Sequence, residues 1–277
     1  MQVNLTERVV ETARAPEDDA PLLETALAIA AVEYPELDTG RYREQLDQWA
    51  DTILSRLSED PSLEEVIQTL NDFLFLEQGF EGNRDDYYDP RNSFINDVLD
   101  RRRGIPLTLS IVYIELGRRL GLPFKGVSFP GHFLVKLSLD GGAVVLDPFN
   151  GGISLSEEDL GELLQMSDFD APGDFGRLLA AARKQDIVVR LLRNLKVVYQ
   201  RAGQLEKALD IVNLILAIDE SLIPEYRDRG LILTELDCNQ AARRDLEHYL
   251  AVNPADEDAD AIRALIDELA IERSSLH

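Results

Sequence analysis

The chain has 277 residues and a formal net charge of −24, because 52 acidic side chains outnumber 28 basic ones. Such a charge repels phosphate backbones, so it disfavours general binding to nucleic acid or to an anionic membrane. The hydrophobic share of 45% is enough for a packed core and excludes a chain that is disordered throughout.

The composition also restricts the compartment and the cofactors. One cysteine, Cys238, can form no disulfide within the chain and no cysteine-based metal site, which fits a reducing compartment. The three histidines, His132, His248 and His277, lack the spacing of metal ligands, and no glycine-rich phosphate motif occurs. The first residues lack the apolar region of a signal peptide, and no apolar run reaches the roughly 18 residues of a membrane span. We therefore expect a cytoplasmic protein without metal, cofactor or membrane contact.

The N-terminal part is predicted to be helical. Residues 1–20 form a polar lead-in, and the helical subregion follows over 21–80. Residues 22–33 are apolar on nearly all sides, which indicates a buried helix. Residues 41–57 carry apolar side chains at intervals of three or four, and Ser62 is expected to cap one more helix.

Residues 92–152 form the predicted core of a first domain that extends over 21–176. A long polar loop rich in Gly, Asp and Asn leads into it, and loops of this length are often functional. Ser93 is expected to cap a short helix that Gly104 ends.

The central helix of this core is predicted over 107–120. Pro106 suits its first turn, because the N–H that proline lacks would have no partner there. The helix is apolar on most faces, so it should lie at the centre of the domain. Gly121 ends it, and Pro123 prevents its continuation.

Three strands are predicted after this helix, over 125–129, 132–139 and 143–147. Pro130 and Gly131 link the first two tightly, and Gly141 and Gly142 form the hairpin between the last two. The sequence therefore predicts an α+β class, with a helical N-terminal part and a small antiparallel sheet packed on a central helix. Ser156 then caps a helix with Asp159 as its capping-box partner, and the domain boundary is expected in 168–176.

The last region, 185–277, contains an internal repeat with an offset of 34 residues. Ala208 pairs with Ala242 at this offset, and small residues allow two helices to approach closely there. Gly203 pairs with Asp237. A helix–turn–helix period of this length resembles the tetratricopeptide (TPR) repeat, and 259–271 would add a capping helix. The residues that carry the repeat are Asn194, Tyr199, Gly203, Ala208 and Ala242.

Two residues of the predicted sheet suggest acyl chemistry. His132 begins one strand and Asp147 ends its antiparallel partner, so a hairpin brings both side chains to the same end of the sheet. Acyl transfer needs a nucleophile beside such a pair, and the N-terminus of the packed helix is the natural place for it. The hydroxyls near that helix start are those of Thr108 and Ser110.

This stretch resembles the transglutaminase-like core, in which a Cys at a helix start precedes a His and an Asp on successive strands. His132 and Asp147 match the family His and Asp. Counting back from the turn that begins at Gly121 brings the family cysteine to Pro106, and neither Pro106 nor its neighbours is Cys. The nucleophile that the resemblance implies is thus missing from this position.

A closer resemblance is to the SirB-type transglutaminase-like/TPR proteins of bacteria. The shared runs are RRGIPLTLSIVY, GRRLGLP, FPGHFLV and DPFNGG, followed by TPR repeats, and the resemblance extends from Leu22 to Asn253. It implies a transglutaminase- or papain-like core that usually lacks the catalytic cysteine, followed by an all-α module of helical hairpins.

Three functions remain open at this point. The first is a non-catalytic protein- or peptide-binding module, a pseudoenzyme that engages its partner through the TPR groove or the cleft of the core. The net charge favours a basic partner. The second is a hydrolase or acyltransferase in which Thr108 or Ser110 replaces the cysteine and works with His132 and Asp147. The third is a structural subunit of an assembly. The residues predicted to line the cleft are Asn92, Pro106, Phe129, Gly131, His132, Asp147 and Asn150.

Overall fold

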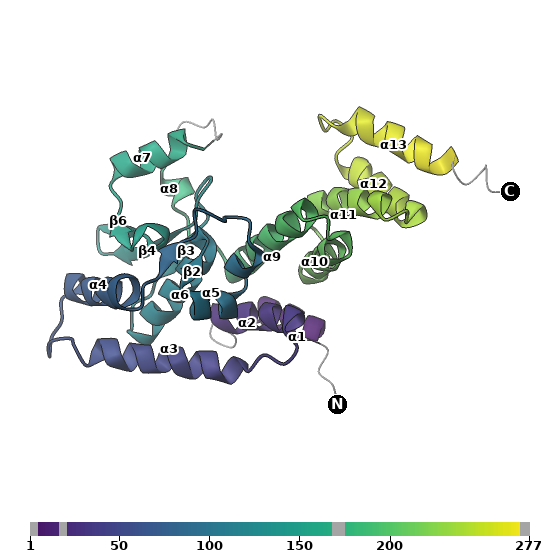
Figure 1. Cartoon of the computed structure of the whole chain (residues 1–277). Helices are drawn as coiled ribbons and strands as arrows, with labels where there is room; N and C mark the ends of the chain where they lie inside the picture. The colour runs from purple at the N-terminus through teal and green to yellow at the C-terminus, as the bar shows by residue number, and fades with distance from the viewer. Residues whose placement is uncertain (1–4, 17–20, 168–174, 272–277) are drawn as a thin grey trace. The chain divides into compact units, whose positions relative to one another are not determined.

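The chain folds into two compact units, one up to Leu191 and one from Leu192 onward, in a computed structural model. The structure describes residues 5–16, 21–167 and 175–271. The predicted α+β class is confirmed. The first unit combines helices with a small antiparallel sheet, and the described residues of the second unit form helices and connecting turns without strands (Figure 1). The domain bounds predicted from the sequence, 21–176 and 185–277, stay predictions.

The first unit contains eight helices in its described residues, and a ninth starts in it. They are α1 (Leu5–Arg14), α2 (Leu22–Glu33), α3 (Thr39–Leu54), α4 (Leu63–Asn71), α5 (Ile95–Arg101), α6 (Pro106–Arg119), α7 (Glu157–Gln165), α8 (Phe175–Leu178) and the start of α9 (Lys184–Arg201). Part of the predicted polar lead-in thus forms α1, which packs on α2 with Val9 and Ala13 buried.

Two sheets occur in the described part of this unit. The short β1 (Glu81–Gly82) and β2 (Arg103–Gly104) pair in parallel. The larger sheet is antiparallel and contains β3 (Lys125–Val127), β4 (Leu134–Leu139), β5 (Gly142–Asp147) and β6 (Ile153–Ser154) in that order. Three short helical segments of other types also occur in the described part of this unit. They are the π-helix η1 (Asp72–Glu77) and the 3-10 helices η2 (Pro90–Asn92) and η3 (Pro148–Asn150).

Helix α6 occupies the centre of the unit, as predicted. Every residue from Pro106 to Gly117 is buried, and the helix lies between α3 and the sheet (Figure 1). Pro106 stands at its first turn, and Gly121 follows its end with a φ of 78°. The buried Glu115 accepts a hydrogen bond from the backbone N–H of Leu23 and pairs with two arginines, so α6 also holds the start of α2.

The sheet differs from the prediction at the start of its second strand. β4 begins at Leu134, and His132 lies in a turn in which its N–H donates to the carbonyl of Phe129 over 3.1 Å. Pro130 and Gly131 occupy the middle of this turn, and Gly131 has a φ of 66°, as a type II turn requires. The turn therefore places His132 two residues before the strand.

Two further local predictions are wrong. The hairpin between β4 and β5 turns on Asp140 and Gly141, because Gly142 already pairs with Leu139. Ser93 does not cap α5, because Phe94 holds the N-cap position, and Ser93 instead follows η2, where its N–H bonds the carbonyl of Pro90. The capping box of Ser156 and Asp159 at the start of α7 is confirmed.

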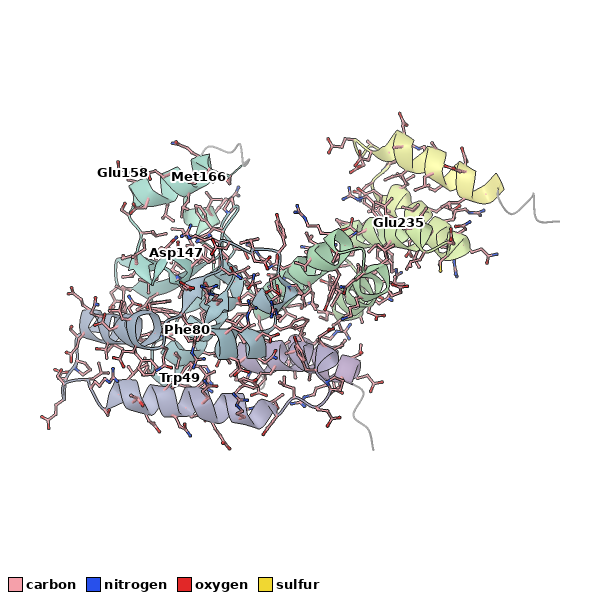
Figure 2. The ribbon with its side chains drawn as sticks, viewed as in Figure 1. Trp49, Phe80, Asp147, Glu158, Met166 and Glu235 are labelled. Carbon is pink, nitrogen blue, oxygen red and sulfur yellow. The ribbon has the colours of Figure 1, made fainter. Side chains whose placement is uncertain are left out.

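The long polar loop between α4 and α5 is anchored at both ends. The ring of Phe80 meets Trp49 of α3 edge-on at 5.9 Å, and both residues are labelled in Figure 2. The Arg102 guanidinium lies over both rings. Farther along, the buried Asn83 donates to the side-chain oxygen of Asn92 over 2.9 Å. These contacts give the loop a fixed path past the end of the sheet.

The second unit consists of antiparallel helices with the predicted repeat. After the end of α9, its helices are α10 (Leu205–Ile218), α11 (Ile223–Glu235), α12 (Asn239–Val252) and α13 (Ala259–Ile271). Ala208 and Ala242 are fully buried, as close helix approach requires. Gly203 and Asp237, which the repeat pairs, both adopt left-handed backbone with φ of 67° and 57°. Aspartate tolerates this conformation better than most residues, so both turns keep the same shape.

The remaining repeat residues support the same hairpins. Tyr199 is buried at the end of α9, where the ammonium of Lys207 lies over its ring at 5.3 Å, and Asn194 is half-buried. Between α9 and α11, the buried Lys196 pairs with the buried Glu225 over 2.7 Å. Glu225 thus compensates the charge of the buried Lys196.

Candidate functional site

The structure brings His132 and Asp147 together, as the hairpin predicts. The Nε2 atom of His132 lies 2.9 Å from Oδ2 of Asp147. An ionised carboxylate can only accept, so Nε2 is the donor in this bond. In the neutral ring Nδ1 is then the unprotonated nitrogen, and it makes no hydrogen bond within the described residues. His132 therefore presents Nδ1 as a base, with its ring oriented by Asp147.

Asp147 is completely buried, and the local chain surrounds it with donors. It caps η3 through Oδ1, which accepts the N–H of Phe149 over 3.0 Å, while Oδ2 also accepts the side-chain amide of Asn150 over 2.6 Å. Burial by itself raises the pKa of Asp147, but the bonds from His132, Asn150 and Phe149 outweigh it and hold this pKa below its usual value. The carboxylate is therefore ionised at neutral pH.

A second layer of side chains covers this pair. The Phe149 ring meets the His132 ring edge-on at 5.9 Å, and the Arg84 guanidinium lies 5.0 Å from the centre of the Phe149 ring. Arg84 also donates to Oδ1 of Asn150. A Cβ at Gly82 would come within 2.5 Å of the Phe149 ring, so only glycine allows β1 to pass so close. The His132 side chain keeps 11% of its surface exposed.

The helix start that matches the family cysteine is closed. The Thr108 hydroxyl donates to the backbone carbonyl of Asn92 over 2.7 Å and accepts the N–H of Ile105 over 3.1 Å. The Ser110 hydroxyl faces the carbonyl of Phe133 at 3.5 Å. Both side chains are fully buried, and within the described residues neither hydroxyl makes a hydrogen bond to the His132 ring.

The predicted cleft residues fall into two groups. His132, Asp147 and Asn150 form one hydrogen-bonded set, and Phe129 and Gly131 shape the turn that carries His132. Asn92 and Pro106 belong to the buried helix start, where Asn92 also bonds the carbonyls of Asp86 and Tyr87.

Sequence reasoning missed Arg84, Phe149 and Arg190. Arg190 of α9 donates through a terminal NH2 to the backbone carbonyl of His132 over 2.8 Å. The DPFNGG run pointed to the neighbourhood of Phe149. No local pattern marked the two arginines, because they reach the site from distant parts of the chain.

Each unit also has a hollow on its surface. In the first unit a groove of about 640 Å³ lies between α4–η1 and β5–β6. Leu76, which is 77% exposed, and Ile153, which is 53% exposed, line it together with the carboxylates of Glu64 and Asp72. In the second unit a smaller hollow of about 300 Å³ lies between α11 and α13 and includes Leu231.

Among the described residues, no group of three or more His, Cys, Asp and Glu side chains is arranged to hold a metal ion. Within the same residues, the helices are too short or too polar to cross a bilayer.

Comparisons with known proteins agree with this architecture. The family model of the transglutaminase-like superfamily matches residues 40–193, which is more than half of the chain. The tetratricopeptide repeat model matches residues 195–267. A "UPF0162 protein" of Xylella fastidiosa is 39% identical over 264 residues, which cover 94% of each chain. The chain belongs to the UPF0162 family of transglutaminase-like/TPR proteins.

Other members of the UPF0162 family match over nearly the same length. "UPF0162 protein YchA" of Escherichia coli K12 is 30% identical over 262 residues, covering 93% of this chain and 96% of the relative. "Protein SirB1" of Salmonella typhimurium is 27% identical over 261 residues, covering 94% and 97%. No solved structure matches the chain significantly. The TPR repeats of the family point to protein–protein interaction in general, because such repeats form extended binding surfaces.

Proposed function

We propose that this chain is a non-catalytic transglutaminase-like/TPR protein that binds a protein or peptide partner. One observation carries the proposal: the oriented His132–Asp147 pair is retained, while the start of α6, which matches the family cysteine, offers no free nucleophile. A catalytic site needs nucleophile and base within hydrogen-bond reach of each other. Here the base is present and the nucleophile is replaced by residues that build the core.

The second candidate, a Ser/Thr hydrolase or acyltransferase, is less well supported. Thr108 would have to abandon two buried hydrogen bonds before it could attack, which leaves the Asn92 carbonyl and the Ile105 N–H unpaired. Ser110 lies two residues farther into the helix and is also buried. The single thiol, Cys238, is exposed at the start of α12 in the second unit. It suits the reducing conditions of the cytoplasm.

The binding surfaces that suit the proposal are the groove of the first unit and the helices of the second. Exposed Leu76 and Ile153 give the groove apolar anchors, and Glu64 and Asp72 give it an acidic character. β6 is the last strand of its sheet in the described residues, so its outer edge could pair with an extended peptide. These features favour a partner with apolar side chains flanked by Lys or Arg.

A labelling experiment separates binding from catalysis. The full chain is treated with a reactive acyl ester, and adducts are mapped by mass spectrometry in the wild type, His132→Ala and the control His248→Ala. We expect no adduct on Thr108 or Ser110 and equal ester hydrolysis in all three proteins. An adduct on either hydroxyl that disappears only in His132→Ala would establish the enzyme and overturn the proposal.

A capture experiment locates the partner. The full chain is cross-linked in native extract and compared with Leu76→Ser/Ile153→Ser in the groove and Leu231→Ser in the second unit. Met166→Ser is the matched control, because Met166 is 84% exposed at the end of α7 and lies outside both hollows (Figure 2). We expect a specific set of captured proteins that one of the hollow variants loses and the control retains. An identical set in every protein contradicts a binding role for both surfaces, and capture of the chain itself alone would favour the assembly subunit.

A further inference from the structure

A second cavity of the first unit lies against the turn that carries His132. It has a volume of about 630 Å³ and is lined by Ser128–Gly131 and by side chains of α8 and α9 that include Arg177, Asp186 and Arg190. It shares no lining residue with the groove beside β6. The arginines make it a different kind of surface from the acidic groove.

Arg190 is the unusual residue of this cavity. It is half-buried, its guanidinium lies 5.4 Å from the centre of the Phe133 ring, and one terminal NH2 donates to the His132 carbonyl. No carboxylate within the described residues pairs with it. Most arginines of this acidic chain do have such a partner, as Arg56 has Glu77 and Arg119 has Asp47.

The carboxylate nearest along the helix is already engaged. Asp186 lies one turn before Arg190 and also lines the cavity, but Arg183 holds it with two hydrogen bonds of 2.9 and 2.8 Å. Arg183 thereby compensates the charge of Asp186. The same hydrogen bonds lower the pKa of Asp186. Among the described residues that line the cavity, Arg177 and Arg190 therefore give an excess of positive charge.

An unpaired guanidinium of this kind is costly. Burial lowers the pKa of Arg190, against the opposite influence of the Tyr87 phenol, yet a guanidinium in a protein does not lose its proton. The charge must then be tolerated or matched by an anion from outside. The guanidinium has five N–H groups in a planar fork, and its one hydrogen bond within the described residues, to the His132 carbonyl, leaves donors for a ligand.

We propose that this cavity binds an oxyanion, a carboxylate or a phosphate, which Arg190 holds with its free guanidinium N–H groups. Arg177 adds a second cation, and the exposed Ser128 adds a hydroxyl that makes no hydrogen bond within the described residues. The inference is independent of the proposed partner binding, because it requires neither the acidic groove nor the TPR unit.

The site has a built-in reporter. Arg190 bonds the carbonyl of His132, so an anion on Arg190 should change the environment of the His132 ring. His248 lies in the second unit, where its ring packs against Tyr226 at 4.4 Å, and serves as the internal control. Imidazole NMR signals of the full chain can thus follow binding directly.

The test is a titration at fixed pH and ionic strength with inorganic phosphate, with succinate and with chloride. We expect saturable shifts of the His132 signals with phosphate or succinate, none with chloride, and no change at His248. Saturation by phosphate alone identifies a phosphate site and saturation by succinate alone a carboxylate site, and both outcomes support the proposal. Shifts that stay linear with every anion overturn it.

Variants decide whether Arg190 is responsible. Arg190→Gln should weaken binding at least about tenfold, because charge-assisted hydrogen bonds are lost, and Arg190→Lys should restore only part of it. Arg41→Gln makes the same change of net charge at an exposed position that does not line the cavity, so it should retain binding. Arg177 is exposed, so Arg177→Gln should weaken binding without affecting the fold. Equal affinity in the wild type, Arg190→Gln and Arg177→Gln would refute the site.

Discussion

The end of the sheet at His132 and the start of α6 at Pro106 are held in opposite ways. At the sheet end, polar side chains bond each other and leave Nδ1 of His132 free of partners within the described residues, with part of the ring exposed. At the helix start, the hydroxyls bond the backbone and are completely buried. In a thiol enzyme both places would have to be accessible. Here one place keeps the orientation of a base and the other is part of the core.

The His132–Asp147 pair also has a structural task. Asp147 accepts three hydrogen bonds, from His132, Asn150 and Phe149, and so joins β5, η3 and the turn before β4. This structural task would explain the pair without any reaction. The comparison can be tested by removing hydrogen bonds at each place and measuring the stability of the first unit. Trp49, the single tryptophan of the chain, lies in that unit and reports its unfolding.

The largest effect is expected from Asp147→Ala. Three donors lose their acceptor in a buried site, so the free energy of unfolding should fall by about 3–5 kcal/mol. Urea denaturation followed by Trp49 fluorescence measures it. Asp85→Ala removes the same charge from an exposed position of the long loop and should change stability by no more than about 0.5 kcal/mol. A loss below about 1 kcal/mol for Asp147→Ala would mean that the pair has no structural task.

A smaller loss is expected at the helix start from Thr108→Val. Valine has the shape of threonine but leaves the Asn92 carbonyl and the Ile105 N–H without their partner, which should cost about 1–3 kcal/mol. Ser110→Ala is the matched variant, because its contact with the Phe133 carbonyl is at the 3.5 Å limit of a hydrogen bond. It should cost less than Thr108→Val in the same denaturation assay. A reversed order would show that the closed helix start depends on Ser110.

The smallest effect concerns acid stability. The pKa of Asp147 is lower in the folded chain than in the unfolded chain, so its contribution is complete above the unfolded value of about 3.9. That contribution is lost as the pH falls through the lower folded pKa. Asp147→Asn lacks the ionisable carboxylate, so the variant should lose less stability than the wild type when the pH falls from about 5 to about 2. Parallel curves of unfolding free energy against pH would contradict the ionised pair.

The sequence anticipated the features that depend on neighbouring residues. Pro106 and Gly121 bound α6 as expected, and the hairpin that joins β4 and β5 was enough to bring His132 and Asp147 to one end of the sheet. The errors were local as well: Ser93 closes a 3-10 turn, and His132 belongs to the turn of Pro130 and Gly131. In both cases a short turn competed with a regular element for the same backbone groups.

Sequence by itself thus determined the helices, the antiparallel strands, the repeat that pairs Gly203 with Asp237, and the absence of a cysteine at the helix start. These features follow from periodicity and from the backbone preferences of single residues, which act over a few positions. Tertiary structure alone decided that the Thr108 hydroxyl bonds the Asn92 carbonyl. It also decided that Arg190 bonds the His132 carbonyl and pairs with no carboxylate within the described residues. A side chain's partner depends on which distant elements pack beside it, and no local pattern encodes that.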